Sequence, residues 1–263
     1  MEGSVKSQNA NYENFSKILN WEVFWNENKK EIEEELLKAL QVTFASDPVY
    51  YTEDEKKEVF EERINAEKEF SRILLQSLSG LLERNKKILM LFDVDETIGK
   101  AFYDKKNVFH TVIRPAFLLI MKRLQDLRTT GKVDVGLLTT RGELRKQLED
   151  PENLQPIKEI IHPDHLYSAR GVTLGYDNEN GCEVLEDRSK ESSVLRTNIL
   201  ENEAFQLRNS GTLKKLTLLQ EIRVKNSGKL FLVVDDDRYP SFLDEEKGFI
   251  GIGLDRDTMF SLR

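Results

Sequence analysis

The chain has 263 residues, of which 33% are charged and 39% hydrophobic, and it carries a net charge of −8. These values fit one domain, or one domain with an accessory module, and an acidic chain has no general electrostatic attraction for nucleic acid. The sequence contains no run of about 18 apolar residues, no apolar secretion-signal core and a single cysteine, Cys182, so we expect no membrane span, no intramolecular disulfide and a cytoplasmic location.

Residues 1–85 are predicted to form a helical region. Apolar residues recur at helical spacing from Phe15 onward, and Pro48 interrupts the pattern because proline cannot continue a helix. Thr52 and Glu55 have the spacing of a capping box, which predicts the start of a second helix. The charged residues between the apolar positions are expected to form a solvated face.

The pattern changes at Lys86, where short apolar runs begin to alternate with helical stretches. This alternation predicts a parallel sheet covered by helices. One helix is expected from Pro115, at a favoured first-turn position, and another from Ser210 or Thr212. Strands are expected near 88–92, 133–138, 165–169, 229–234 and 249–253.

The second region, 86–263, is therefore expected to be an α/β domain with helices on both faces of its sheet. Its segment 98–114 is short and is expected to contain an exposed loop at 104–106. The connection at about 170–211 is longer and is expected to be a small insertion. Within it, GVTLGYDNENGCEVLED has the form of a β-hairpin with an Asn/Gly turn.

Polar residues gather where the predicted strands end, and ligands of open parallel sheets bind beyond those ends. Acids and a threonine follow the strand at 88–92, two threonines follow the strand at 133–138, and three acids follow the strand at 229–234, of which Asp237 is expected to cap or support rather than to bind a metal directly. Two lysines lie near the start of the last predicted helix. These candidate site residues are Asp93, Asp95, Thr97, Thr139, Thr140, Lys214, Lys215, Asp235 and Asp236.

This set of residue types indicates a metal ion and a phosphate substrate. Crowded carboxylates need a cation or a proton, and oxygen ligands without histidine or cysteine favour Mg²⁺. Because Mg²⁺ commonly binds phosphate oxygens, a phosphate ester is the natural substrate class. One aspartate can accept a phosphoryl group, a second can transfer protons, and lysine and threonine can stabilise the transferring group.

Four segments resemble the motifs of the haloacid dehalogenase (HAD) phosphatase superfamily, in the right order. They are LFDVDET, GLLTT, Lys215 with Leu218, Leu219 and Ile222 after it, and LVVDDD. The resemblance covers residues 88–253 and leaves the N-terminal helical region outside. It implies a Rossmann-like core with a parallel sheet, helices on both faces and a small cap.

The resemblance also implies roles for the candidate residues. Asp93 would be the nucleophile, and Asp95 the general acid and base, with its main-chain carbonyl holding Mg²⁺. Asp235 and Asp236 would complete the metal site. Thr139 and Lys215 would bind phosphate, with Lys214 competing for the role of Lys215 and with Thr97 and Thr140 in support. Arg141 could contact substrate or be solvated.

Two other functions remain open at this stage. A glycosyltransferase also places a DxD sequence after an apolar strand, to hold a metal and a nucleotide-sugar, although Lys215 and the pair Asp235–Asp236 would then be unexplained. A HAD-like core could also serve as a non-catalytic binding module. A two-component receiver domain uses the same residue types in a different order.

A small cap would leave the site open, which suits a phosphorylated macromolecule such as a phosphotyrosine protein. The charge-rich chain with an added helical region is similar to bacterial HAD-type effector protein phosphatases. That resemblance implies a second possible location, a host cell reached by a signal-peptide-independent route. The sequence does not define the oligomeric state.

Overall fold

The computed structural model covers the chain with gaps, and residues 1–17 and most of the predicted insertion lie outside the residues it describes. The described residues are 18–46, 51–84, 86–103, 106, 108–171, 175–177, 182–184, 210–237, 240, 243, 248–255 and 257–260.

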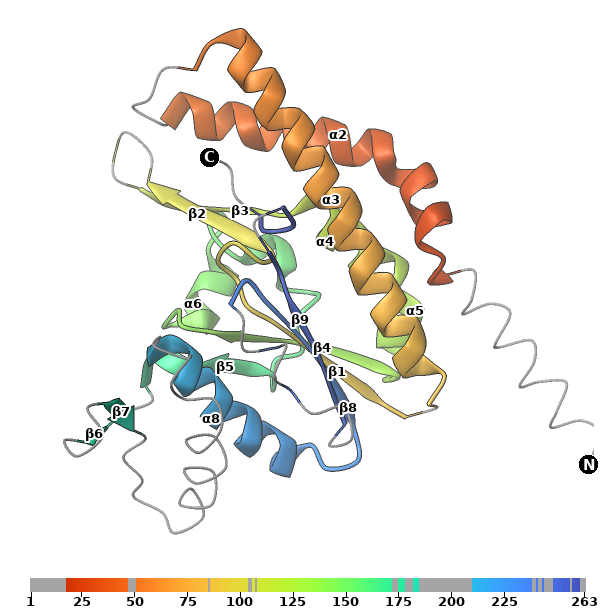
Figure 1. Ribbon diagram of the computed structural model, residues 1–263, viewed down its shortest axis with the longest axis vertical. Coiled ribbons are helices and arrows are strands. Elements are labelled where there is room, and N and C mark those ends of the chain that lie inside the picture. The colour runs from red at the N-terminus through yellow and green to blue at the C-terminus, as the bar shows by residue number, and fades with distance from the viewer. Residues whose placement is uncertain are drawn as a thin grey trace, which may run out of the picture.

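The core of the molecule is a five-stranded parallel sheet, as the sequence predicted (Figure 1). Each predicted strand is present to within one residue at either end, and the fold class is confirmed as α/β with a Rossmann-like sheet flanked by helices. In the order in which they pair across the sheet, the strands are β5 (Leu166–Ser168), β4 (Val133–Thr139), β1 (Ile88–Phe92), β8 (Leu230–Asp235) and β9 (Phe249–Gly253).

Both faces of the sheet are covered because its central strands are apolar on both sides. In β1, Ile88, Met90 and Phe92 face one core, which also receives the N-terminal helices. Leu89 and Leu91 face a second core, built with the C-terminal helix. Figure 1 shows the two helical layers on opposite sides of the sheet. They are α2 (Trp21–Ser46), α3 (Glu53–Leu82), α4 (Pro115–Arg123) and α5 (Gln125–Thr129) on one side and α8 (Ser210–Lys225) on the other.

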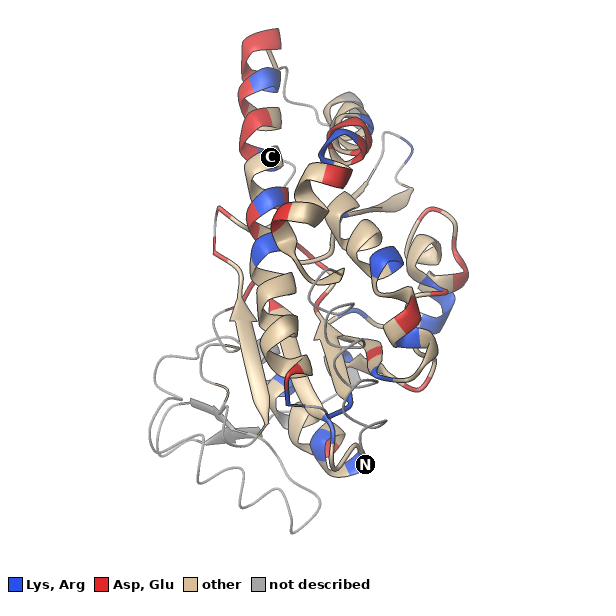
Figure 2. Ribbon diagram, turned by 90° about the vertical axis from the view of Figure 1, so that its right-hand side faces the viewer, with Lys and Arg blue, Asp and Glu red and all other residues tan. Residues whose placement is uncertain are grey.

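The capping box predicted at the start of α3 is confirmed. The Glu55 main-chain N–H donates to the Thr52 hydroxyl at 3.3 Å, and the Thr52 N–H donates to the Glu55 carboxylate at 2.7 Å. Glutamates and lysines alternate along the outer surfaces of the long helices, where they form exposed ion pairs (Figure 2). Within the described residues, no helix is long and apolar enough to cross a membrane.

A buried ion pair joins α3 to Arg114, the residue that precedes α4 and contacts the loop after β1. The Arg114 guanidinium donates to the Glu67 carboxylate at 2.7 Å, and both side chains are fully buried. Arg114 also donates to the main-chain oxygens of Thr97 at 3.1 Å and Thr258 at 2.7 Å, and it lies 3.9 Å from the centre of the Phe70 ring. The helical region therefore supports the loop that carries Asp95 and Thr97.

Two hairpins lie outside the main sheet. The predicted hairpin in the insertion is present as β6 (Gly175–Asp177) and β7 (Cys182–Val184). The sequence analysis missed the other, formed by β2 (Gly99–Tyr103) and β3 (Phe109–Ile113), and assigned only a loop to that segment. Of the loop predicted at 104–106, residues 104 and 105 lie outside the described residues, and Lys106 is exposed as predicted.

Three short helical segments complete the description. Two of them connect β4 to β5 and the third follows β5, and none was predicted. They are α6 (Leu144–Glu149) and the 3-10 turns η1 (Gln155–Ile157) and η2 (Ala169–Gly171).

Candidate active site

Three carboxylates converge at the carboxyl ends of two neighbouring strands. Asp93 follows β1, Asp235 ends β8 and Asp236 follows it. The parallel pairing of these strands places Phe92 beside Val234, and the Asp93 N–H donates to the Val234 oxygen at 3.0 Å. One carboxylate oxygen from each aspartate lies within 4.8 Å of the others. The predicted acidic cluster is therefore present as a spatial group.

Lys215 of α8 reaches into this cluster. Its ammonium nitrogen lies 2.7 Å from Asp235 Oδ2 and 3.1 Å from Asp93 Oδ1, and the residue is 4% exposed. Lys214 is partly exposed and has no contact with the three carboxylates among the described residues. Of the two lysines that the sequence left open, Lys215 is the one at the cluster.

The threonines divide into two groups. Thr139, at the end of β4, is fully buried and hydrogen-bonds to Asp93. Thr97 is also fully buried, and its hydroxyl donates to Asp236 Oδ1 over a long distance of 3.4 Å. Thr140 is exposed and makes no contact with the acids in the part of the chain that the structure describes. Thr139 and Thr97 thus line the cluster and Thr140 does not.

Asp95 lies apart from the three clustered carboxylates. Its side chain is 44% exposed and accepts two hydrogen bonds from Arg141, at 2.9 Å from Nε and 2.6 Å from Nη2. Arg141 is 9% exposed, so the solvated position considered from sequence is wrong. The topology places both residues at the same edge of the sheet, but the sequence does not specify that these two side chains pair with each other.

Burial and mutual repulsion disfavour the charges of the acids. Burial, helped by the charge of Asp235, raises the pKa of Asp93 to about 6 against the opposing effect of Lys215. Burial, with the charges of Asp235 and Asp93, raises the pKa of Asp236 to about 8. Burial also opposes the charge of Lys215, but the two carboxylates outweigh it and raise the pKa of the ammonium group. One lysine therefore does not neutralise three acids.

The cluster has the properties of a site for a hard divalent cation. Its donors are all carboxylate oxygens, which Mg²⁺ prefers. Asp93 Oδ1 is buried and has no well-aligned hydrogen bond among the described residues, although Lys215 lies within ion-pair distance. A buried oxygen without such a bond is costly, and a cation would satisfy it. Asp93, Asp235 and Asp236 are the residues that would hold the ion.

The raised pKa values predict that the metal-free protein loses stability as pH rises. The folded chain binds these protons more tightly than the unfolded chain, whose aspartates titrate near 3.8. The stabilising effect is therefore complete below about pH 4 and disappears as pH passes through about 6 and then about 8. Mg²⁺ should restore stability at pH 8, by about 2.7 kcal/mol when its concentration is a hundred times its Kd.

Urea unfolding of the metal-free protein at several pH values, with and without Mg²⁺, measures both effects. Asp236→Asn should flatten the pH dependence above about pH 6 and remove the stabilisation by Mg²⁺, because it deletes one acid from the cluster. Replacing the exposed Asp126 by Asn is the matched control and should change neither. Equal stabilisation by Mg²⁺ in the wild type and Asp236→Asn would place the metal elsewhere.

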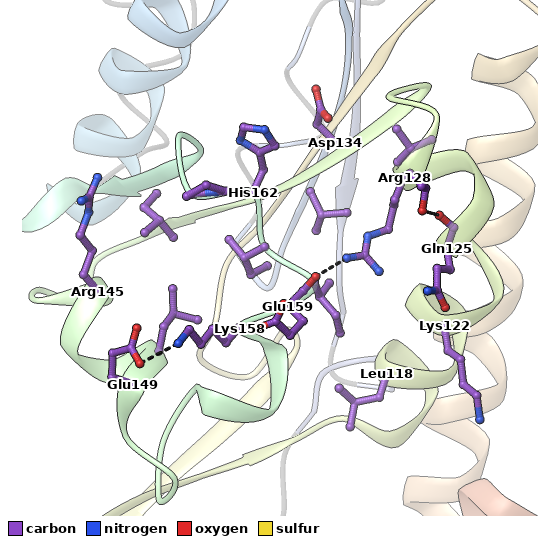
Figure 3. A pocket seen from close by; sticks show the side chains of 18 residues that line it. Leu118, Lys122, Gln125, Arg128, Asp134, Arg145, Glu149, Lys158, Glu159 and His162 are labelled. Atoms are coloured by element: carbon purple, nitrogen blue, oxygen red, sulfur yellow. Dashed lines mark hydrogen bonds and ion pairs between the residues drawn. The ribbon is translucent and has the colours of Figure 1, made fainter.

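The hollow shown in Figure 3 lies away from this cluster. It has a volume of about 870 Å³ and opens between α4–α5 and α6, with Val133 and Val135 of β4 in its wall. Three of the charged groups that line it are engaged with neighbours: Lys158 pairs with Glu149 at 2.7 Å, and Arg128 donates to a main-chain oxygen. None of the predicted site residues lines it.

Comparison of the chain with protein-family models, curated proteins and solved structures finds no match. The functional argument therefore depends on the geometry of the site. Sequence analysis missed two contributors to that geometry, the Asp95–Arg141 pair and the buried Glu67–Arg114 pair. The sequence did contain a sign that Glu67 of the second pair is buried, because this residue occupies an apolar position of α3, three residues before the buried Phe70.

Proposed function

We propose that this protein is a Mg²⁺-dependent phosphomonoester hydrolase of the HAD type, acting through an aspartyl-phosphate. The observation that carries the proposal is that Lys215 and Thr139 both contact Asp93, which lies in one cluster with Asp235 and Asp236. A nucleophile, a cation for the phosphate and a set of metal ligands thus meet at one place, as phosphoryl transfer requires. The glycosyltransferase alternative gives Lys215 no role.

In the proposed reaction an Asp93 oxygen attacks phosphorus, and the bond from phosphorus to the ester oxygen breaks. Asp95 gives a proton to the departing oxygen. Asp95 then takes a proton from a water molecule that attacks the aspartyl-phosphate, which releases inorganic phosphate and restores Asp93. Lys215 and Thr139 hold the phosphoryl oxygens through both steps. Bound Mg²⁺ would neutralise charge on the phosphoryl group and on the aspartates.

We further propose a large substrate, such as a phosphotyrosine protein. Among the described strands, those outside the main sheet form two short hairpins, β2–β3 and β6–β7. The β2–β3 hairpin presents apolar side chains to solvent, with Tyr103 63% and Val108 41% exposed. Exposed apolar side chains near a site favour contact with a partner surface.

The test is phosphate release by the purified protein from p-nitrophenyl phosphate, phosphotyrosine peptides and small sugar phosphates. We expect release that requires Mg²⁺ and stops with a chelator, and faster release from phosphopeptides than from sugar phosphates. Failure with every ester, while Mg²⁺ still stabilises the fold, would refute the hydrolase. Nucleotide-sugar cleavage would then favour a transferase, and its absence a binding module.

A further inference from the structure

The Asp95 carboxylate is held by a single arginine. Asp95 lies on the turn between β1 and β2, and among the described residues no group other than Arg141 makes a hydrogen bond to its carboxylate. The contact is a planar fork, because two guanidinium nitrogens each donate to a different oxygen. Such a fork determines the plane of the carboxylate as well as its position.

Arg141 is itself anchored at both ends. Its guanidinium Nη1 donates to Thr111 Oγ1 at 2.9 Å and to Gln147 Oε1 at 3.2 Å. Its main-chain N–H donates to the Thr139 hydroxyl at 3.3 Å, and its main-chain oxygen accepts from the Ser168 hydroxyl at 2.6 Å. The partly exposed Asp95 carboxylate is thus held by the buried Arg141 side chain, which has little freedom to move.

The same arginine contacts the β2–β3 hairpin. Thr111 belongs to β3, and its hydroxyl also donates to Asn153 Oδ1 at 3.0 Å. The Phe109 ring, also on β3, has its centre 5.4 Å from the Arg141 guanidinium carbon. One side chain therefore contacts both Asp95 and the hairpin, which is also held by the Thr111 N–H that donates to the Glu152 oxygen at 2.8 Å.

We propose that Arg141 is a positioning residue that orients the Asp95 carboxyl group for proton transfer and links this orientation to the β2–β3 hairpin. When Asp95 carries the proton, one of its oxygens still accepts from Arg141 and the other presents its O–H to the leaving ester oxygen. After the proton has left, both oxygens accept from Arg141, as in the structure. The inference rests on the proposed phosphatase function. A general acid must present its oxygen within hydrogen-bond distance of the atom that it protonates. An exposed carboxylate on a turn meets this condition only if another group holds it.

The test compares two esters whose leaving groups differ in basicity. Phenolate needs a proton as it departs far more than p-nitrophenolate does, so a poorly oriented acid slows phenyl phosphate selectively. Arg141→Ala and Arg141→Lys should each lower kcat for phenyl phosphate at least about tenfold more than kcat for p-nitrophenyl phosphate, since general acids contribute about 10²–10⁴-fold. Lysine cannot replace Arg141 because it has the positive charge but cannot make the two parallel hydrogen bonds to the carboxylate.

Arg145→Ala is the matched control, because this exposed arginine of α6 borders the remote hollow and should leave both rates unchanged. Thr111→Val keeps the fork but removes the acceptor on the hairpin, so it should show the same selectivity to a smaller degree. Equal losses for both esters in the Arg141 variants would overturn the proposal, because they would indicate phosphate binding or general damage.

Amide hydrogen exchange tests the link to the hairpin without turnover. Arg141→Ala should increase exchange in β2 and β3 relative to β1 and to Arg145→Ala, whereas unchanged exchange would overturn the link. If the wild type hydrolyses neither ester, the proposed function fails, and the exchange result still decides whether Arg141 holds the hairpin.

Discussion

Replacing Asp93 by Asn is expected to reduce phosphate release by about 10³–10⁶-fold, the loss typical of removing a nucleophile. Asparagine has the shape of aspartate but cannot form the aspartyl-phosphate. The fold should remain intact, because the substitution removes a charge whose burial raises the pKa of Asp93 to about 6. We therefore expect the metal-free variant to unfold at a urea concentration no lower than the wild type does at pH 8.

The measurement is the initial rate of phosphate release at saturating Mg²⁺, with urea unfolding of the same samples. Asp126→Asn, an exposed aspartate far from the cluster in the sequence, controls for the loss of one negative charge. A rate for Asp93→Asn within tenfold of the wild type would contradict the assignment of the nucleophile. Loss of rate together with loss of the unfolding transition would show damage to the fold instead.

Breaking the buried Glu67–Arg114 pair should cost about 3–5 kcal/mol of unfolding free energy. Burial raises the pKa of Glu67 and lowers the pKa of Arg114, so each charge is maintained by its partner. Glu67→Gln keeps the size of the side chain but leaves the guanidinium buried without its counter-ion. The Ala116 N–H also donates to Glu67, at 2.8 Å, and would lose a charged acceptor.

Urea unfolding of Glu67→Gln beside Glu27→Gln tests this expectation. Glu27 pairs with Arg123 at 2.6 Å but is 56% exposed, and a surface pair contributes about 1 kcal/mol or less. Similar losses for both variants would contradict the special role of the buried pair. Because Arg114 also binds the Thr97 oxygen, Glu67→Gln should lower phosphatase activity as well, whereas Glu27→Gln should not.

The parts of the fold that could be predicted are those encoded in local patterns. The apolar runs of β1 and β8 identify strands buried on both faces, and the acids after them share a sheet edge because the strands are parallel. Thr139 and Lys215 could be placed by the same topological argument. The cluster could therefore be predicted from the sequence.

The parts that could not be predicted depend on side-chain partners far apart in the chain. Nothing near Asp95 identifies Arg141 as its partner. The position of Glu67 among the apolar residues of its helix indicates burial, but it does not identify Arg114 as the counter-ion. The β2–β3 hairpin was missed because its strands are only partly buried, so neither shows a clear apolar alternation.

The central claim, that Asp93 carries the phosphoryl group, is tested most directly by acid quenching during turnover followed by mass spectrometry of the peptides. We predict a transient population in which the peptide containing Asp93 is heavier by one phosphoryl group, formed only with Mg²⁺ and absent from Asp93→Asn. Turnover with no phosphorylated peptide, or with the phosphoryl group on a different residue, would contradict the account.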